Sequence, residues 1–364
     1  MLQLGDLFCP EDIYKQEGDR LKAEDNALLK DRSDQSRRGI DARQAKRKDL
    51  MKQQLDLFDE RKEHFVRKAK RKIYLSRLYQ VSFPDADVKP DTISDLLLEQ
   101  CVLPRVSLSP VDAEYTFRFI KSLHDWNAPG FRLMSFYNRL FSTNRLRSLI
   151  FTSTTREAEF FGRFLKLVLE DLSKWHKNAL EPQDKDRVAK NQPRVGVYDK
   201  EAIGNREQGR LGFALTHDEN GKPLTFVEHN QFRDMLFAWH KNLNNALKSC
   251  LTGSEWMHIR NAITVLKTIV DYFPAVDFMA SQFSTQLQKI TQQEMASKPS
   301  PDSEIGDRVD LAVAAQGAMS ELQRRKSKWV MVQAFRPNAD GGSRTDEKGS
   351  KLRATASEFK PGSK

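Results

Sequence analysis

Apolar residues recur every three or four positions through most of residues 91–178 and 225–296, which is the spacing of one face of an α-helix. The alternation of apolar and polar residues that marks a strand is scarce. The pattern therefore predicts an all-α fold of stacked antiparallel helices, similar to a HEAT-like α-solenoid. We expect helices at residues 92–102, 110–126, 131–151, 155–177, 226–251, 253–273 and 276–295.

Several of these apolar runs are preceded by a hydroxyl residue that is followed three positions later by a carboxylate. In this arrangement the hydroxyl accepts a hydrogen bond from the backbone of the third helical residue, and the carboxylate bonds back to the capping residue. The sequence therefore predicts helix starts at five such pairs, which are Thr92/Asp95, Ser109/Asp112, Thr154/Glu157, Thr225/Glu228 and Thr252/Glu255.

The first 85 residues are dominated by charge, and residues 41–72 hold twelve Lys/Arg against six Asp/Glu. Apolar residues at steps of three and four predict one long amphipathic helix that packs along a narrow stripe. The basic cluster near its end is either solvated helix surface or a nucleic-acid contact. The stripe consists of Met51, Leu55, Phe58, Phe65, Ala69 and Ile73, and the cluster consists of Lys68, Lys70, Arg71 and Lys72.

Four parts follow from these patterns. Residues 1–85 form the charged, long amphipathic helical segment, and residues 86–300 form a helical domain with a polar insert at about 179–224, which we expect to be a surface loop. A terminal helix occupies 301–330, and a disordered basic tail occupies 331–364, because that segment is rich in Gly, Ser and Lys. A second basic cluster either contacts nucleic acid or only aids solubility, and its members are Arg324, Arg325, Lys326 and Lys328.

The net charge of +10, with an isoelectric point near 9.4, indicates an acidic partner such as nucleic acid, phospholipid or an acidic protein. No apolar run is long enough to span a membrane, and the amino terminus lacks the features of a signal peptide. The three cysteines lie far apart, which argues against a disulfide framework and a thiolate metal site and favours a reducing compartment.

Catalytic motifs are missing from the sequence. It contains no HExxH, no phosphate-binding loop and no nucleophile elbow. The dipeptide His124-Asp125 resembles one element of a histidine–aspartate metal site, so a helical metal-dependent nucleotide hydrolase requires His124, Asp125 and His258 to converge in space. We instead predict a protein that is not an enzyme and has no cofactor, metal or catalytic residues.

The motif Trp-His-Lys-Asn occurs twice, at Trp175 and at Trp239. Both tryptophans follow apolar residues at helical spacing, which favours core anchors over platforms on which bases stack. The histidines beside them, His176 and His240, are expected to be half exposed.

The stretch "EWMHIRNAITVLKTIVDYFP" (255–274) places a polar group beside an apolar helix face. Trp256, Ile259 and Ile263 fall on the face predicted to be buried, whereas His258 and Asn261 fall largely on the opposite side. Arg260 or His258 is then the residue that would bond a neighbouring helix or subunit.

Ordered segments of the chain resemble the THO complex subunit 2 family, the large scaffold subunits of the THO/TREX transcription–export assembly. They are "CVLPRVSLSPVDAEYTFRFIKSLHDWNAPGF" (101–131), "FFGRFLKLVLEDLSKWH" (160–176), "FRDMLFAWHKNLNNALKSCLTGSEWMHIRNAITVLKTIVDYFP" (232–274) and "LQRRKSKWV" (322–330). The start, "LGDLFCPEDIYKQEGDRL", is similar to the segment that precedes this region in the family. We therefore expect the chain to be a carboxyl-half portion of a longer subunit.

The resemblance implies a nuclear, non-enzymatic scaffold that couples transcription elongation to messenger RNA processing, packaging and export. Its implied partners are other THO/TREX subunits, a DEAD-box RNA-dependent ATPase, and RNA in messenger ribonucleoprotein or DNA, with no membrane. Composition fits a second function equally well, namely a stand-alone RNA-binding HEAT-like module without THO partners.

Overall fold

The computed structural model describes residues 4–83, 89–180, 195–204, 209–217, 223–296 and 308–336. These residues are almost entirely helical, which confirms the all-α class, and one short antiparallel hairpin, β1 (Ala214–His217) with β2 (Pro223–Phe226), accompanies the helices. The helices are α1 (Leu4–Leu7), α2 (Glu11–Lys30), α3 (Arg37–Ser82), α4 (Pro90–Leu97), η1 (Leu98–Val102), α5 (Leu103–Val106), α6 (Pro110–Asp125), α7 (Leu133–Leu140), α8 (Thr143–Thr152), α9 (Thr155–Lys177), η2 (Asp199–Ile203), η4 (Leu211–Phe213), α11 (His229–Leu251), α12 (Trp256–Ile269), α13 (Asp277–Ala296), α14 (Val309–Arg324), η5 (Lys326–Lys328) and α15 (Val332–Phe335).

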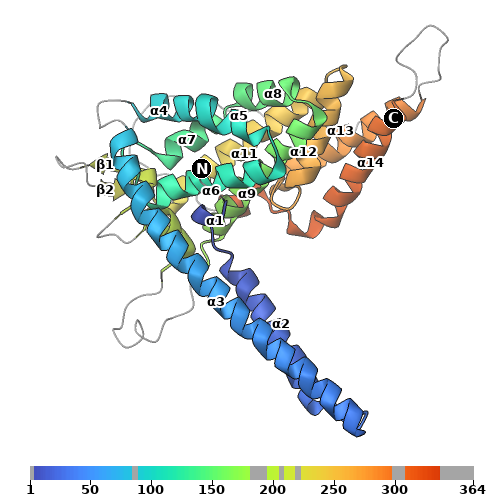
Figure 1. Cartoon of the computed structure of the whole chain (residues 1–364). Helices are drawn as coiled ribbons and strands as arrows, with labels where there is room; N and C mark the ends of the chain where they lie inside the picture. The colour runs from blue at the N-terminus through green and yellow to red at the C-terminus, as the bar shows by residue number, and fades with distance from the viewer. Residues whose placement is uncertain are drawn as a thin grey trace, which may run out of the picture.

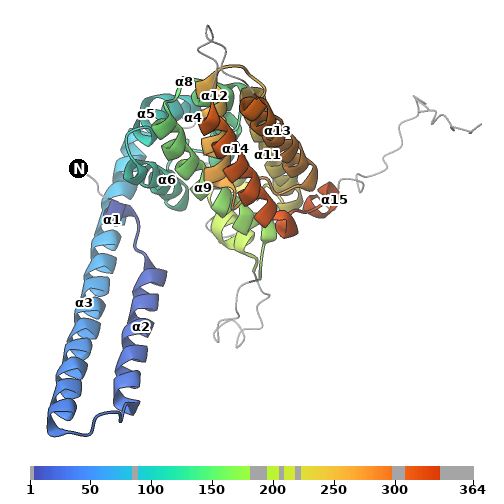
Figure 2. The ribbon, with the colours of Figure 1, turned by 90° about the vertical axis from the view of Figure 1, so that its right-hand side faces the viewer.

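Two long helices, α2 and α3, form a hairpin that projects from a body of shorter stacked helices (Figures 1 and 2). The last turns of α3 enter the body, where Leu75 and Tyr79 are buried. The Tyr79 hydroxyl lies 2.9 Å from the Ser122 hydroxyl of α6, and its ring stacks on Trp126. The hairpin is therefore anchored at one end only.

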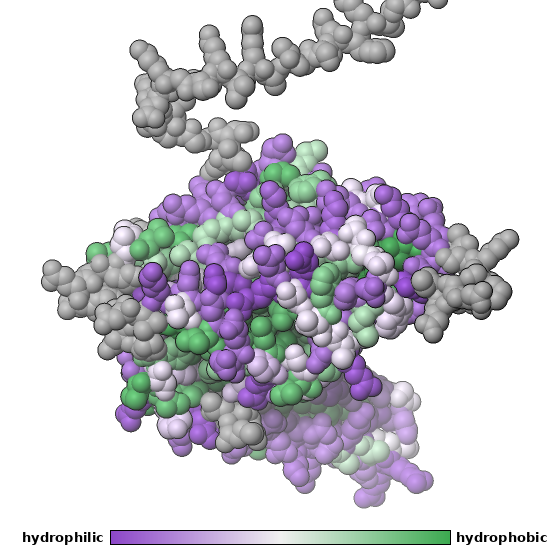
Figure 3. Space-filling view, turned by 90° about the horizontal axis from the view of Figure 1, so that it is seen from above, coloured by the Kyte–Doolittle hydropathy of each residue, from purple (hydrophilic) through white to green (hydrophobic). Residues whose placement is uncertain are grey.

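In the body, successive helices pack side by side: α6 on α9, α9 on α12, and α12 on α14, while α11 contacts α8, α12 and α13. Figure 1 shows these helices as a stack, as expected for a helical solenoid. One continuous apolar core runs through the stack and includes Phe136, Phe164, Leu266 and Phe283. Seen from above, the outer surface is mainly hydrophilic, with small separate hydrophobic patches (Figure 3). Among the described helices, none is long and apolar enough to cross a membrane.

Some predicted boundaries need correction. Helix α9 occupies the predicted residues, but the single helix expected at 131–151 is divided into α7 and α8 at Phe141 and Ser142. Phe226 belongs to β2, so the next helix, α11, begins at His229. The helix expected at 92–102 extends over residues 90–106 and contains a π-helical segment, η1.

The capping prediction is confirmed for Thr154/Glu157, where the Glu157 amide donates to the Thr154 hydroxyl (3.3 Å) and the Thr154 amide to the Glu157 carboxylate (2.7 Å). Ser109 also caps α6, because its hydroxyl accepts from the Asp112 amide at 3.0 Å. The prediction is wrong for the other three pairs, since their residues make different contacts.

Asp95 bonds Arg139 and Arg145 across to neighbouring helices, so it does not cap α4. Thr225 lies in β2, and Glu228 is itself the cap of α11, paired with Gln231. Thr252 ends α11, where its hydroxyl donates to the carbonyl of Lys248. The pattern of residue types is the same at all five sites, but tertiary contacts decide its use.

The prediction that α3 packs along its apolar stripe is also wrong. Met51, Leu55, Phe58 and Ile73 are 58–61% exposed, whereas Leu50, His64, Leu75 and Tyr79 form the buried face. Helix α2 lies along that other face, where the Tyr14 hydroxyl donates to Glu60 and also contacts His64. The predicted long helix is thus present as α3. However, α2 covers a face of α3 that the most regular apolar spacing of α3 did not indicate.

The insert at 179–224 is not simply a surface loop. In its described portions, Tyr198, Ala202 and Phe213 are fully buried in the core. The Tyr198 hydroxyl donates to the carbonyl of Val227 at 2.8 Å, which ties this segment to the start of α11. Within the tail expected at 331–364, Phe335 is buried against the body, while residues 337–364 lie outside the described part of the chain.

A glycine sets how closely α9 and α12 approach. A Cβ atom added at Gly162 would lie 2.9 Å from the Cβ of Thr268, whereas one added at Gly317 of α14 meets no atom within 4 Å. Both glycines lie inside helices, where alanine is intrinsically favoured by about 1 kcal/mol.

We therefore predict opposite effects on the free energy of unfolding, measured by denaturant titration. Gly317→Ala should raise it by about 1 kcal/mol, and Gly162→Ala should lower it, because α9 and α12 must move apart. An equal gain from both substitutions would contradict a close α9–α12 contact.

Candidate functional site

The first predicted basic cluster lies on α3, where Lys70, Arg71 and Lys72 are exposed. Lys68 is half-buried, and its charge acts on Cys9, which lies between α1 and α2. Burial raises the pKa of the Cys9 thiol, and the positive charge of Lys68 opposes that rise. The exposed side chains Lys70, Arg71 and Tyr74 border a shallow hollow along the helix. Three of the four predicted cations are therefore accessible to a ligand.

The second basic cluster divides into structural and exposed residues. Arg325 is half-buried and donates a hydrogen bond to the carbonyl of Val270, just beyond the end of α12. Burial lowers the pKa of this guanidinium. Arg324 forms an ion pair with Glu321, whereas Lys326 and Lys328 are exposed on η5. The cluster at α14 lies well apart from the α3 cluster in both views (Figures 1 and 2), so the two do not form one surface.

Both tryptophans are core anchors, as predicted. Trp175 is fully buried, and its indole donates to the Glu201 carboxylate at 3.0 Å. Trp239 is 2% exposed, and its indole donates to the Asn138 amide oxygen at 2.8 Å. Neither ring is available for stacking with a base.

The histidines that follow the tryptophans differ from each other. His176 is half-buried as expected, and its Nε2 lies 3.0 Å from the carbonyl of Phe335. His240 was expected to be half exposed but is 4% exposed, because residues 325–336 fold back over it and bring Phe335 against its ring. Burial lowers the pKa of His240 to about 3, so the ring is neutral at physiological pH.

Asn261 was placed on the outer side of its helix and is instead fully buried. Its side-chain amide donates to the carbonyls of Ile150 (3.0 Å) and Ser153 (2.5 Å), at the end of α8 and the turn before α9. The Ile150 carbonyl lies in the last turn of α8, where a helix leaves its carbonyls without an intrahelical partner, and Ser153 follows that turn. Asn261 therefore joins α12 to the α8–α9 connection.

Arg260 does contact a neighbouring helix. Its guanidinium donates to the backbone carbonyl of Asp310 at 3.3 Å, and the indole of Trp256 donates to the Asp310 carboxylate at 3.0 Å. His258 stacks on Phe151 of α8, with 4.1 Å between ring centroids. The polar group of α12 therefore braces α8, α9 and α14.

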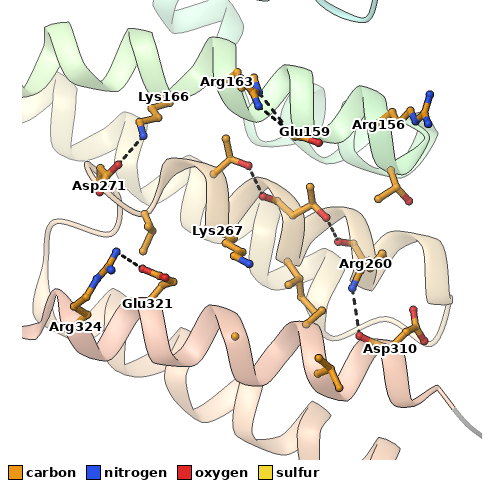
Figure 4. Close-up of a pocket in the computed structure, with 18 of the residues that line it drawn as sticks. Arg156, Glu159, Arg163, Lys166, Arg260, Lys267, Asp271, Asp310, Glu321 and Arg324 are labelled. Atoms are coloured by element: carbon orange, nitrogen blue, oxygen red, sulfur yellow. Dashed lines mark hydrogen bonds and ion pairs between the residues drawn. The ribbon is translucent and has the colours of Figure 1, made fainter. Parts of the chain in front are cut away.

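A groove of about 1130 Å³ lies between α9, α12 and α14 (Figure 4). Aliphatic side chains form part of its lining, and Val309 and Val313 on the α14 side are 50% and 60% exposed. Charged residues from all three helices surround this lining. They are Arg156, Glu159, Arg163 and Lys166 of α9, Arg260 and Lys267 of α12, Asp271 just beyond it, and Asp310, Glu321 and Arg324 of α14.

Most of these charges neutralise one another inside the groove. Arg163 pairs with Glu159 at 3.0 Å, and Lys166 pairs with Asp271 at 2.6 Å, as the dashed lines in Figure 4 show. Arg156 and Lys267 are exposed and have no ion pair with any residue in the described part of the chain. The groove thus offers apolar contact area and an excess of positive charge, which suits an acidic amphipathic segment of another protein.

Sequence reasoning did not single out Arg156 or Lys267. Helical spacing shows that each is on the surface of its own helix. It does not show that residues more than a hundred positions apart face one groove, because that depends on how α9 packs against α12.

The three residues of the hydrolase hypothesis do not form a site. His124 is 1% exposed among aromatic rings, and its Nε2 lies 3.2 Å from the carbonyl of Glu201. Burial lowers the pKa of His124 to about 3. His258 is engaged with Phe151, and among the described residues no group of three or more His, Cys, Asp or Glu could hold a metal ion.

We predict that Asn261→Ala lowers the free energy of unfolding by about 1–3 kcal/mol, because two carbonyls lose their donor in the core. Asn245→Ala is the matched control: Asn245 is exposed on α11, and its replacement should be neutral or slightly stabilising. Denaturant titration of both variants measures the difference. Equal effects would mean that the buried amide contributes nothing to stability.

Comparison with known proteins agrees with the resemblance seen in the sequence. Residues 1–322 match the family model Tho2, described as "Transcription factor/nuclear export subunit protein 2". THO complex subunit 2 of Homo sapiens is 30% identical over 250 residues, 68% of this chain, and the protein of that name from Arabidopsis thaliana is 28% identical over 341 residues, 92% of the chain. The Saccharomyces cerevisiae protein is 26% identical over 184 residues.

The chain spans 14% of the length of the human relative and 16% of the plant one. The matches cover both the hairpin and the helical body, since the family model includes the residues of both. The chain belongs to the Tho2 family, the family of THO complex subunit 2.

Proposed function

We propose that this chain is a non-enzymatic scaffold segment of a THO/TREX complex in the nucleus, coupling transcription to messenger RNA packaging, processing and export. The observation that carries the proposal is the family match over residues 1–322, because the relatives are named as subunits of the THO complex. The helical stack supports it, since solenoids present long surfaces for partner proteins.

Other THO/TREX subunits and a DEAD-box RNA-dependent ATPase are the proposed protein partners. The groove between α9, α12 and α14 is the proposed contact for one of them. Its exposed valines supply apolar area, while Arg156 and Lys267 supply positive charge that no described residue neutralises. Positive charge at the rim of an interface steers an acidic partner and excludes a basic one.

Nucleic-acid contact is a second part of the proposal, and it is separable from the first. The exposed residues Lys70, Arg71 and Lys72 on α3, and Lys326 and Lys328 on η5, are its proposed sites. The net charge of +10 supports contact with phosphates, which is largely independent of base sequence.

A stand-alone RNA-binding module of the same fold is the alternative. Such a module would also use the basic clusters, but it would not bind THO subunits. Binding of THO subunits distinguishes the two functions, because a stand-alone RNA-binding module would not bind them.

Binding at the groove can be measured by pull-down and calorimetry, with the full chain and purified THO/TREX subunits, including the DEAD-box ATPase. Arg156→Glu with Lys267→Glu should weaken binding of the subunit that uses the groove by about tenfold or more, because like charges then face each other. Lys248→Glu with Lys289→Glu is the control, since both lysines are exposed on α11 and α13 outside the groove. If a folded wild-type chain binds none of the subunits, the scaffold function is wrong.

Nucleic-acid contact can be tested by the slope of the logarithm of RNA affinity against the logarithm of salt concentration. For single-stranded RNA, each phosphate contact contributes about 0.7 to that slope. Lys70→Ala with Lys72→Ala, and separately Lys326→Ala with Lys328→Ala, should therefore each reduce the slope by about 1.4. Lys241→Ala with Lys248→Ala on α11 should leave it unchanged. A slope that neither cluster alters would exclude both clusters as phosphate contacts.

A further inference from the structure

A cavity lies between α9, α11 and the carboxyl-terminal segment that folds back over the body. Its volume is about 670 Å³, which is within the range of sites that hold small molecules. The turn after α12 supplies a third wall, and residues 325–335 supply the last. The charged and aromatic nitrogen groups that line this α9–α11 cavity, apart from Asp271, are Lys177 and His176 of α9, Arg233 and His240 of α11, and Arg325 and Lys328.

The cavity has an excess of positive charge. Four cations line it, whereas the one carboxylate among its described lining residues is Asp271. Asp271 already pairs with Lys166 at 2.6 Å, as a dashed line in Figure 4 shows. It also attracts Arg325, but Lys177, Arg233, Arg325 and Lys328 form no ion pair within the described part of the chain.

The carboxylates next to these positions are engaged elsewhere. This matters because an acidic residue near a cation could neutralise it without being part of the lining. Glu170 pairs with Lys174 (3.9 Å), Asp171 with Lys121 (2.8 Å) and Asp234 with Arg336 (2.6 Å), while Asp277 accepts from the backbone amide of Phe278 (2.7 Å).

The donors of Arg233 are also without partners. This guanidinium is half-buried, and it makes no hydrogen bond to any residue that the structure describes. Arg325 uses one N–H for the carbonyl of Val270, and its Nε is buried without a partner. Buried polar atoms of native proteins are nearly always hydrogen-bonded, so unsatisfied guanidinium groups from two elements at one cavity indicate a ligand with acceptor oxygens.

His240 provides an independent indication. It is 4% exposed and lines the cavity, and its Nδ1 has no hydrogen-bond partner among the described residues. A neutral imidazole carries one N–H, which can lie on Nδ1 and donate to an anion. The ring can therefore bind an acceptor without becoming charged.

The second histidine of the cavity senses the same cations. Burial lowers the pKa of His176, and the positive charges of Arg233 and Lys177 lower it further, while the hydrogen bond to the carbonyl of Phe335 opposes them. Side chains from α9 and α11 thus direct positive charge toward the same small region.

We propose that the α9–α11 cavity binds a small soluble anion that carries several phosphate groups. Arg233 and Arg325 donate to phosphate oxygens, since a guanidinium matches their geometry, and Lys177 and Lys328 neutralise the remaining charge. One phosphate monoester carries about −1.5 to −2 charges at neutral pH, so four cations match at least two such groups. The proposal goes beyond the scaffold function and does not depend on it.

A compact ligand fits better than a polynucleotide. Arg233 and Arg325 are half-buried and His240 is almost fully buried, and the carboxyl-terminal segment covers one side. A phosphodiester backbone reaches exposed cations such as Lys70 and Lys72 more readily, because it passes along a surface.

Isothermal titration calorimetry with the full chain tests this binding. The probes are inorganic tripolyphosphate and inositol hexakisphosphate, at about 150 mM salt, where attraction between exposed charges is largely screened. At least one of the two should bind in a ratio of one to one, and inorganic phosphate should bind at least about tenfold more weakly. Binding of neither probe, or equal binding of inorganic phosphate, overturns the proposal.

A pair of variants tests the position of the site. Arg233→Gln with Lys177→Gln should weaken probe binding by at least about tenfold, because two charge-assisted contacts are lost. Lys241→Gln with Lys248→Gln is the matched control, since it removes the same charge from exposed positions of α11 that do not line the cavity. An equal loss in both variants would mean that the probe binds only to surface charge, and the proposal would be wrong.

Folding of the variants is checked by circular dichroism. The side chains of Arg233 and Lys177 have no hydrogen bond to any described residue, so helix content should stay unchanged. Arg325 is left in place because its bond to Val270 holds the carboxyl-terminal segment.

A single-stranded RNA without a terminal phosphate separates this site from the proposed RNA contact. It should not displace the bound probe, and Arg233→Gln with Lys177→Gln should leave the salt dependence of RNA affinity unchanged. RNA that displaces the probe and binds more weakly to this variant would assign the cavity to RNA and overturn the proposal. Both substitutions leave Lys326 and Lys328 intact, so failure here is distinguishable from failure of the RNA contact.

Discussion

The body of this protein depends on one buried amide. Asn261 lies in the middle of a helix that touches α8, α9, α11 and α14, and its two hydrogen bonds reach the backbone of Ile150 and Ser153. A hydrophobic contact tolerates sliding, whereas a buried donor has partners at fixed positions only. The amide thus sets the register of α12 against α8 and α9, and Arg260, one residue earlier, extends the same bracing to Asp310 of α14.

This arrangement explains which parts of the fold the sequence could predict. Periodicity identified the helices of the body and the burial of Trp175 and Trp239, because one apolar face per helix leaves little ambiguity. It placed Asn261 outside, because an amide looks solvent-facing until the carbonyls that it serves are known. Those carbonyls belong to the end of α8 and the residue after it, more than a hundred residues away in the sequence, and no spacing within α12 encodes them.

On α3 the apolar spacing indicated the wrong face for a different reason. Its most regular apolar spacing passes through Leu55 and Phe58, but α2 packs on the face that carries Leu50 and His64. Both faces have enough apolar residues to support a neighbouring helix. The hydrophobic pattern indicates which faces of a helix can be covered. Which of them is covered depends on the neighbouring helices. The groove between α9, α12 and α14 was also not predicted, since it is created by the packing of three helices.

Charge shows a comparable division between structure and function. Arg325 and Lys326 are adjacent in one basic cluster, yet Arg325 is bonded to the carbonyl of Val270, whereas Lys326 is exposed. Beyond them, Val330 pairs with Val276, and Phe335 is buried against His240. Removing the chain from residue 324 onward would therefore damage the body as well as remove positive charge. Substitution of single exposed lysines is the change that separates phosphate binding from folding, because it leaves the contacts of Arg325 and Phe335 intact.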